Sequence, residues 1–185
     1  ALIVAPTREL AEQTHTAIVM LGRKTGLRSL TVYGGVSAQP QIRGLQRGVD
    51  IVVACPGRLL DLIGQRYVKL SAVEVLVLDE CDQMFDMGFL PDIKRIIAGL
   101  PANRQTLLFS ATMPAEIRAL ASEMLRQPVT VELGIQRPVE TVSHAIYNVD
   151  QTSKTETLIA LLQQDEIGKV LVFTRTKHRA KKLAE

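Results

Sequence analysis

The chain has 185 residues, of which 46% are hydrophobic and 22% charged, with a net charge of +3 and only two Cys. These values suit one folded domain or slightly more, and they exclude general disorder and a disulfide scaffold. No apolar run approaches the roughly 18 residues of a membrane span, and nothing at the start reads as a signal peptide, so we expect a cytoplasmic protein without a membrane partner.

Short apolar runs predict eight strands along the chain. Most of these runs are continuous rather than alternating, which is typical of strands buried on both faces of a sheet. The expected strands cover residues 1–5, 29–33, 50–54, 75–78, 106–109, 129–133, 143–149 and 170–174.

Helical patterns lie between these strands. A helix is predicted from residue 8 to about residue 21, with Thr7 as its N-cap. Pro91 and Pro114 each stand at the start of another amphipathic pattern, and residues 152–164 carry a further one. The alternation of strands and helices indicates an α/β fold with a mostly parallel sheet.

The apolar pattern is interrupted once, at residues 134–142, where Gly, Arg, Pro and Glu gather. We therefore expect a first domain over residues 1–133, an interdomain linker over 134–142 and the start of a second domain over 143–185. The last segment is too short to be a complete doubly wound domain.

Polar clusters follow the first five expected strands at the points where they end. In a parallel sheet these ends lie along one edge, where ligands bind. Polar loops occur in any α/β protein, which explains one or two such clusters but not this combination. The clusters are Pro6-Thr7-Arg8-Glu9, Gly34-Gly35, Cys55-Pro56-Gly57-Arg58, Asp79-Glu80-Cys81-Asp82 and Ser110-Ala111-Thr112.

Asp79 and Glu80 are candidates for nucleotide hydrolysis, because an apolar strand delivers two adjacent carboxylates to its end. One carboxylate can hold Mg²⁺ through water, and the next can orient or deprotonate the attacking water. Two acids are also favoured by the dipole of a following helix, so this tetrapeptide alone supports both interpretations equally.

Arg8 and Arg58 each come shortly after a proline and near a predicted helix N-terminus. With Gly34 and Gly35, which let another backbone approach closely, they suit a phosphodiester backbone better than base edges. Binding would then be independent of base sequence. Taken singly, each arginine is better explained as a solvated surface residue.

Seven short strings give the chain its resemblance to the DEAD-box ATP-dependent RNA helicases, over essentially its whole length. They are APTREL, YGG, PGR, VLDECD, MGF, LFSAT and VLVFTRTK. The resemblance implies a RecA-like P-loop NTPase fold, with a first domain nearly complete but lacking the P-loop strand and a second RecA-like domain only begun. It also implies an enzyme that uses ATP and Mg²⁺ to unwind short RNA duplexes or remodel RNA–protein complexes by closing its two domains.

The same resemblance assigns roles to the matching residues. Asp79 is implied as the Mg²⁺-associated acid, acting through water, and Glu80 as the water-activating acid. Asp82 would hydrogen-bond toward Ser110 and Thr112 and so link the nucleotide site to RNA binding. The residues implied to contact the RNA backbone are Pro6, Thr7, Arg8, Gly34, Gly35, Pro56, Gly57, Arg58, Phe173, Thr174 and Arg175.

Both cysteines depart from the usual family pattern. Cys81 replaces an Ala, and a branch of the family carries the resulting Asp-Glu-Cys-Asp. Cys55 replaces a Thr, which removes a hydroxyl that could contact RNA and predicts slightly weaker RNA binding. Packing is the expected role of each thiol, rather than a disulfide or a metal site.

The sequence contains no phosphate-cradling loop of the form G-x-x-x-x-G-K-[ST]. Residues 22–26 resemble its last part, but they follow a helix, and a helix C-terminus with a basic turn is the better interpretation. Family members carry the loop before this chain starts and further arginine motifs after Glu185. We therefore expect a fragment that is marginally stable and ATPase-inactive alone, in which residues 129–133 lack a neighbouring strand.

Two alternatives remain at this stage. The first is an ATPase-inactive RNA-binding or adaptor protein on the same fold, and ribonucleoprotein partners are compatible with either function. The second is an unrelated nucleotide-binding α/β domain, which requires Asp82 to lie far from Ser110 and Thr112.

Overall fold

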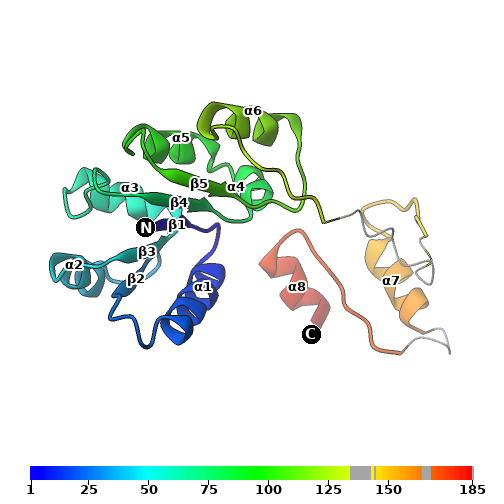
Figure 1. Cartoon of the computed structure of the whole chain (residues 1–185). Coiled ribbons are helices and arrows are strands. Elements are labelled where there is room, and N and C mark those ends of the chain that lie inside the picture. The colour runs from blue at the N-terminus through cyan, green and yellow to red at the C-terminus, as the bar shows by residue number, and fades with distance from the viewer. Residues whose placement is uncertain (134–142, 144, 164–167, 185) are drawn as a thin grey trace. The chain divides into compact units, whose positions relative to one another are not determined.

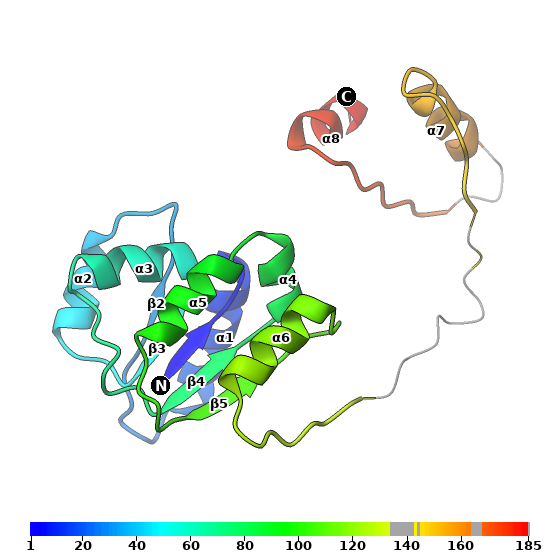
Figure 2. The same cartoon turned by 90° about the horizontal axis from the view of Figure 1, so that it is seen from above.

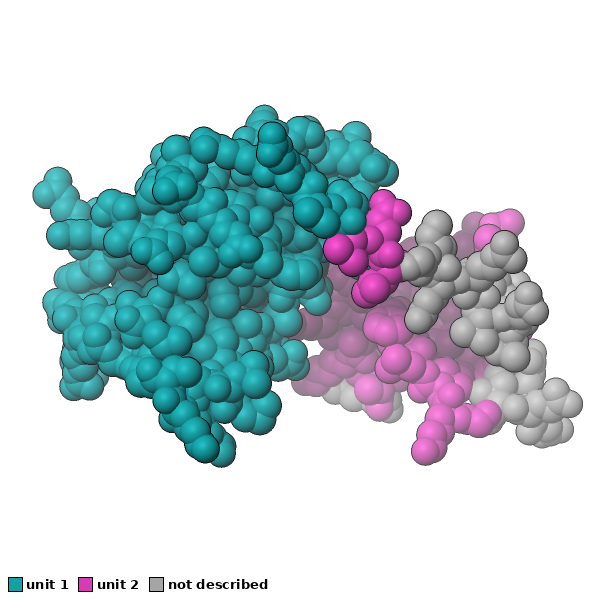
Figure 3. Space-filling model, viewed as in Figure 1, with its two compact units in different colours: residues 1–130 teal, residues 131–185 magenta. Residues whose placement is uncertain are grey.

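The computed structural model describes residues 1–133, 143, 145–163 and 168–184. The chain divides into two compact units, residues 1–130 and 131–185 (Figures 1 and 3). The predicted linker, residues 134–142, lies outside the described residues. Within the described residues, no helix combines the length and the apolar character needed to cross a membrane.

The first unit is built on a five-stranded sheet in the order β2-β3-β1-β4-β5, with every neighbouring pair parallel. The central strand β1 is short, and its Leu2 is in register with Val52 on one side and Leu76 on the other. The strands are β1 (Leu2–Val4), β2 (Ser29–Val32), β3 (Ile51–Ala54), β4 (Val75–Leu78) and β5 (Gln105–Leu108). The first five predicted strands are therefore confirmed.

Helices cover both faces of this sheet, with α1 on one face and α3, α5 and α6 on the other (Figure 2). The larger core joins one face of the strands to α2–α6, whereas Ala5 and Val53 pack with Ala11 of α1 in a smaller cluster. The helices are α1 (Arg8–Leu21), α2 (Gln39–Gln46), α3 (Pro56–Gly64), α4 (Cys81–Asp86), α5 (Leu90–Ala98) and α6 (Ala115–Met124).

Burial alternates along β4, although its sequence is continuously apolar. Leu76 and Leu78 are fully buried in the larger core, whereas Val75 and Val77 are only half-buried. In the described chain, α1 covers the second face over β2 and β3. The prediction that the continuous runs are buried on both faces is therefore wrong for β4.

Three predicted strands are absent from the described part of the chain. The described residues of 129–133, 143–149 and 170–174 have no strand structure, and Val129 and Leu133 are 89% and 93% exposed. A strand needs hydrogen bonds from a neighbour. Residues 129–133 pair with no strand of the sheet, whose order ends at β5.

The described residues of the second unit form two helices, α7 (Lys154–Leu162) and α8 (Lys177–Ala184). Neither has a buried residue among those described. Helix α7 lies within the predicted helical pattern of residues 152–164, of which residue 164 lies outside the described residues. The unit therefore has helices but no hydrophobic core of its own among the described residues.

Candidate functional site

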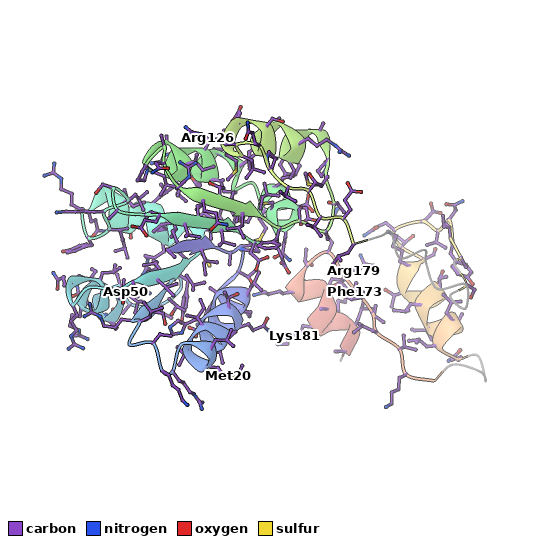
Figure 4. All side chains as sticks on the ribbon, viewed as in Figure 1. Met20, Asp50, Arg126, Phe173, Arg179 and Lys181 are labelled. Atoms are coloured by element: carbon purple, nitrogen blue, oxygen red, sulfur yellow. The ribbon has the colours of Figure 1, made fainter. Side chains whose placement is uncertain are left out.

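The five polar clusters gather at one edge of the sheet because all five strands are parallel and each cluster follows a strand end. Asp50, which precedes β3, lies at the opposite ends of the strands, and Met20 lies near the C-terminus of α1, away from this edge (Figure 4). The arrangement predicted from the order of strands and clusters is confirmed for the first unit.

Asp82 joins the end of β4 to the end of β5. Its Oδ2 accepts hydrogen bonds from the backbone N–H and the hydroxyl of Thr112, both at 2.9 Å. The Ser110 hydroxyl accepts from the backbone N–H of Asp82 at 3.2 Å and donates to the carbonyl of Thr112 at 2.7 Å. These three residues are therefore within hydrogen-bond reach, and the interpretation that required them to lie apart is wrong.

The Asp82 carboxyl is held in its ionised form by this network. Desolvation raises its pKa, but the two hydrogen bonds from Thr112, with the nearby Ser110 hydroxyl and the Gln83 backbone N–H, outweigh that effect and leave the pKa below its ordinary value. Asp82 is thus a charged acceptor that ties two strand ends together at neutral pH.

Asp79 and Glu80 form a sharp turn between β4 and α4. The Asp79 backbone N–H donates to the carbonyl of Val4 at 3.0 Å, so its position is set by the centre of the sheet. Its Oδ1 accepts from the N–H of Glu80 at 3.0 Å. Glu80 has φ 47° and ψ 55°, a left-handed conformation that residues other than glycine adopt rarely. Such strain is concentrated at functional sites, and here it leaves the Glu80 side chain exposed.

The donor set fits a water-mediated Mg²⁺ ion rather than a metal enclosed by protein. Among the described residues, no group of three or more His, Cys, Asp or Glu could hold a metal ion. Mg²⁺ usually keeps several waters and binds one or two carboxylates together with substrate phosphates. No described residue donates to Oδ2 of Asp79, which leaves that oxygen available for this mode of binding.

The cluster after β1 presents an arginine on a short, rigid connection. Pro6 is buried, and the Thr7 hydroxyl accepts from the N–H of Leu10 at 3.2 Å, so Thr7 caps α1 as predicted. Arg8 is exposed, and its guanidinium carbon lies 5.0 Å from the centroid of the Tyr33 ring. The cap orients the first turn of α1, from which Arg8 extends at the site edge.

Gly34 and Gly35 form an exposed loop after β2. A Cβ at either position would meet no atom within 4 Å, so the space above both is open, and Gly35 has a φ of +78° that favours glycine. Gln41 anchors one end of the loop, because its Nε2 donates to the carbonyl of Tyr33 at 3.0 Å. Nothing in the sequence pattern distinguishes this glutamine, whose role depends on its burial on α2.

Arg58 anchors the other end of the loop. Its Nη2 donates to the carbonyl of Val36 at 3.1 Å, and its Nε lies 3.7 Å from Asp61 Oδ2. The Arg58 side chain is only 15% exposed, and its buried Nη1 has no partner among the described residues. The interpretation of Arg58 as a solvated surface residue is therefore wrong. Gly57 beside it is exposed, with open space above it, whereas Pro56 is buried.

Both thiols of the site are protonated. Burial raises the pKa of Cys55 to about 11 and that of Cys81 to about 12, with smaller contributions from nearby acids. Cys81 is fully buried in the larger core, and both cysteines are free. Such surroundings favour unreactive thiols that contribute to packing. Cys55 is also the N-cap of α3, where its side chain makes no capping hydrogen bond.

The remaining predicted site residues belong to the second unit. Phe173 is 87% exposed (Figure 4), and the Thr174 hydroxyl donates to the carbonyl of Thr176 at 2.9 Å. Arg175 is exposed in the same segment. The structure therefore brings the first-unit residues together at one edge and presents these three on a separate unit.

Comparisons with known proteins identify similar chains over nearly the whole length of this one. The sequence model of the DEAD/DEAH box helicase family matches residues 1–120. The DEAD-box ATP-dependent RNA helicase CshA of Streptococcus pneumoniae serotype 4 is 43% identical over 184 residues, covering 99% of this chain and 35% of that protein. The DEAD-box ATP-dependent RNA helicase 40 of Oryza sativa subsp. japonica is 44% identical, covering 99% of this chain and 24% of that protein.

A solved structure gives the same result. The crystal structure of a DEAD box protein from the hyperthermophile Methanococcus jannaschii superimposes with a TM-score of 0.70 at 36% identity, over 99% of this chain and 49% of that chain. The chain thus spans about a third or less of the length of the two curated relatives above. The fold is RecA-like, and the chain belongs to the DEAD/DEAH box helicase family.

Proposed function

We propose that this chain is part of an ATP-dependent RNA helicase that unwinds short RNA duplexes or remodels RNA–protein complexes. The observation that carries the proposal is the hydrogen-bond network of Asp82 with Ser110 and Thr112, which joins the acidic strand end to its neighbour. Relatives whose names state an ATP-dependent RNA helicase activity support it. The proposed location is the cytoplasm, and the proposed partners are RNA and ribonucleoproteins.

The hydrolytic part of the mechanism falls to Asp79 and Glu80. Asp79 would hold Mg²⁺ through water with its free Oδ2. Bound Mg²⁺ would neutralise charge on the ATP phosphates. Glu80 projects its exposed carboxylate from the strained turn beside Asp79, where it orients the attacking water and accepts its proton.

The coupling part of the mechanism falls to Asp82. Because its carboxylate holds the β5 end through Thr112, a change at the acidic turn displaces both strand ends together. ATP and RNA then both favour one closed arrangement of two RecA-like domains, and hydrolysis with phosphate release reopens it. Closure would bend the RNA strand and unpair a short duplex.

The RNA-binding part of the mechanism uses exposed groups on the same edge. Arg8 offers a cation, and the open space above Gly34, Gly35 and Gly57 allows a sugar–phosphate backbone to approach. Pro6, Pro56 and Arg58 are enclosed, so they would shape this surface rather than supply most of its contact area. Contacts of this kind read no base sequence. Phe173, Thr174 and Arg175 would extend the track on the second domain.

The decisive experiment compares the complete encoded protein with its Glu80→Gln variant. We expect RNA of any base sequence to stimulate ATP hydrolysis, and the variant to lose hydrolysis while it still binds RNA. The 185-residue chain alone is expected to bind RNA without hydrolysing ATP, because it has no phosphate-cradling loop. A complete protein that binds RNA but never hydrolyses ATP would favour the adaptor alternative instead.

A further inference from the structure

Tyr33 lies at the end of β2, directly before the Gly34-Gly35 loop, and contacts two residues of α1. The Arg8 guanidinium carbon lies over its ring, 5.0 Å from the centroid. Its hydroxyl donates a hydrogen bond to Oε1 of Glu12. Tyr33 is half-buried, and Gln41 holds its carbonyl at 3.0 Å. One aromatic side chain therefore touches both an exposed arginine and an acid on the same helix.

Arg8 and Glu12 are four residues apart on α1, the spacing at which opposite charges pair across one helical turn. They form no ion pair here, because the Glu12 carboxylate accepts from Tyr33 and, at 3.5 Å, from the Thr31 hydroxyl. Within the described residues, no carboxylate or carbonyl accepts from the Arg8 guanidinium. Its N–H groups are consequently free to bind an anion, in a side chain already held by an aromatic face.

We infer that Tyr33 is a positioning residue for Arg8: its ring holds the guanidinium at the site edge, and its hydroxyl keeps Glu12 from neutralising it. The inference rests on the proposed function, since the anion in question is an RNA phosphate. Gln41 anchors the Tyr33 carbonyl, and Gly34 and Gly35 follow directly in the chain. Tyr33 therefore fixes the positions of both the Arg8 cation and the open loop. Tyr33 thereby raises RNA affinity through Arg8 rather than through base stacking.

A double-mutant cycle on the 185-residue chain tests the positioning role. The variants are Arg8→Ala, Tyr33→Leu and the pair, and fluorescence anisotropy with a labelled oligouridylate gives the dissociation constant at several salt concentrations. We expect Tyr33→Leu to weaken binding about two- to fivefold, the range of one exposed cation–π contact, and to add nothing once Arg8 is absent. Arg8→Ala should also reduce the salt slope by about 0.7, whereas Tyr33→Leu should leave it nearly unchanged.

Two matched control variants remove side chains of the same types at positions away from the site. Tyr67→Leu removes an exposed tyrosine in the loop after α3, and Arg23→Ala removes an exposed cation just beyond the other end of α1. Neither should change RNA affinity by the amount expected at the site. Circular dichroism and thermal unfolding of every variant separate a binding effect from loss of structure.

A second pair of variants tests the role of the hydroxyl while the aromatic ring is retained. Tyr33→Phe frees Glu12 to pair with Arg8, so RNA binding should weaken, and adding Glu12→Gln should restore it. If Arg8→Ala weakens binding but Tyr33→Leu and Tyr33→Phe do not, the inference is overturned while the proposed function stands. If Arg8→Ala itself has no effect, the RNA contact of Arg8 is overturned together with the inference, and ATP hydrolysis by the complete protein still tests the proposed function.

Discussion

Thr112→Val removes one hydroxyl from the Asp82 network and keeps the shape of the side chain. The lost bond is the 2.9 Å contact between the Thr112 hydroxyl and Oδ2 of Asp82, while the backbone N–H of residue 112 keeps its own bond to the same oxygen. Hydrogen bonds to charged groups contribute about 1.5–3 kcal/mol when enclosed. Because Asp82 is only half-buried and Thr112 is exposed, we expect a loss of about 1 kcal/mol at neutral pH.

The stability difference between wild type and Thr112→Val should also depend on pH. The folded-state pKa of Asp82 lies below its ordinary value, so its stabilising contribution is present above the pKa of the unfolded state and is lost as the pH falls through the folded pKa. The difference between wild type and Thr112→Val should therefore be largest near neutral pH and shrink below about pH 4.

Urea unfolding of the 185-residue chain, followed by circular dichroism, measures this difference. A loss of about 1 kcal/mol moves the midpoint by about half a molar in urea. Thr106→Val on β5 is the matched control, because the Thr106 side chain makes no hydrogen bond among the described residues. The reasoning is refuted if Thr112→Val is as stable as wild type at neutral pH, or if its deficit is the same in acid.

Three further predictions concern the loops of the site. Cys55→Thr should stabilise the chain by about 1 kcal/mol and raise its melting temperature, because Thr can cap α3 where Cys makes no capping bond; a lower melting temperature would contradict this. Gly35→Ala should lower the free energy of unfolding, measured in urea, by about 1 kcal/mol because Gly35 has a positive φ. Gly34 has no positive φ, so Gly34→Ala should lower it by less than half as much, and equal losses would argue against a strained turn. The thiols of Cys55 and Cys81, with pKa values of about 11 and 12, should resist a disulfide reagent at neutral pH until urea unfolds the chain, and rapid labelling of Cys81 would contradict its burial.

Local sequence patterns were sufficient to predict the five strands of the first unit and its helices α1, α5 and α6, but not α2. Each of its five strands is a short apolar run that is soon followed by Pro, Gly, Asp or Ser, and Thr7 caps α1 in the way its position predicts. The parallel order then follows from the alternation with helices, and it brings the polar clusters to one edge. The apolar pattern of residues 129–133 predicts a strand that the structure does not contain, because strand formation there depends on a neighbouring strand rather than on composition.

The finer details of the site depend on side-chain partners that no local pattern contains. From the sequence alone, Arg58 is interpreted as a surface cation. In the structure its guanidinium donates to the carbonyl of Val36, 22 residues earlier in the chain. Tyr33 reads as the last residue of a strand, and its contacts with Arg8 and Glu12 arise only because β2 packs beside α1. Gln41 is likewise a polar residue whose burial becomes visible only in the folded chain. These residues form a layer that positions the predicted site.

Coupling between ATP hydrolysis and strand separation is tested most directly by measuring both in the complete encoded protein and in its Thr112→Val variant. If Asp82 transmits the state of the nucleotide through the β5 end, the variant should separate a short RNA duplex more slowly by about fivefold, the rate equivalent of about 1 kcal/mol, with a smaller loss of RNA-stimulated hydrolysis. Duplex separation that is unchanged, or that falls only in proportion to hydrolysis, would contradict the coupling role of Asp82.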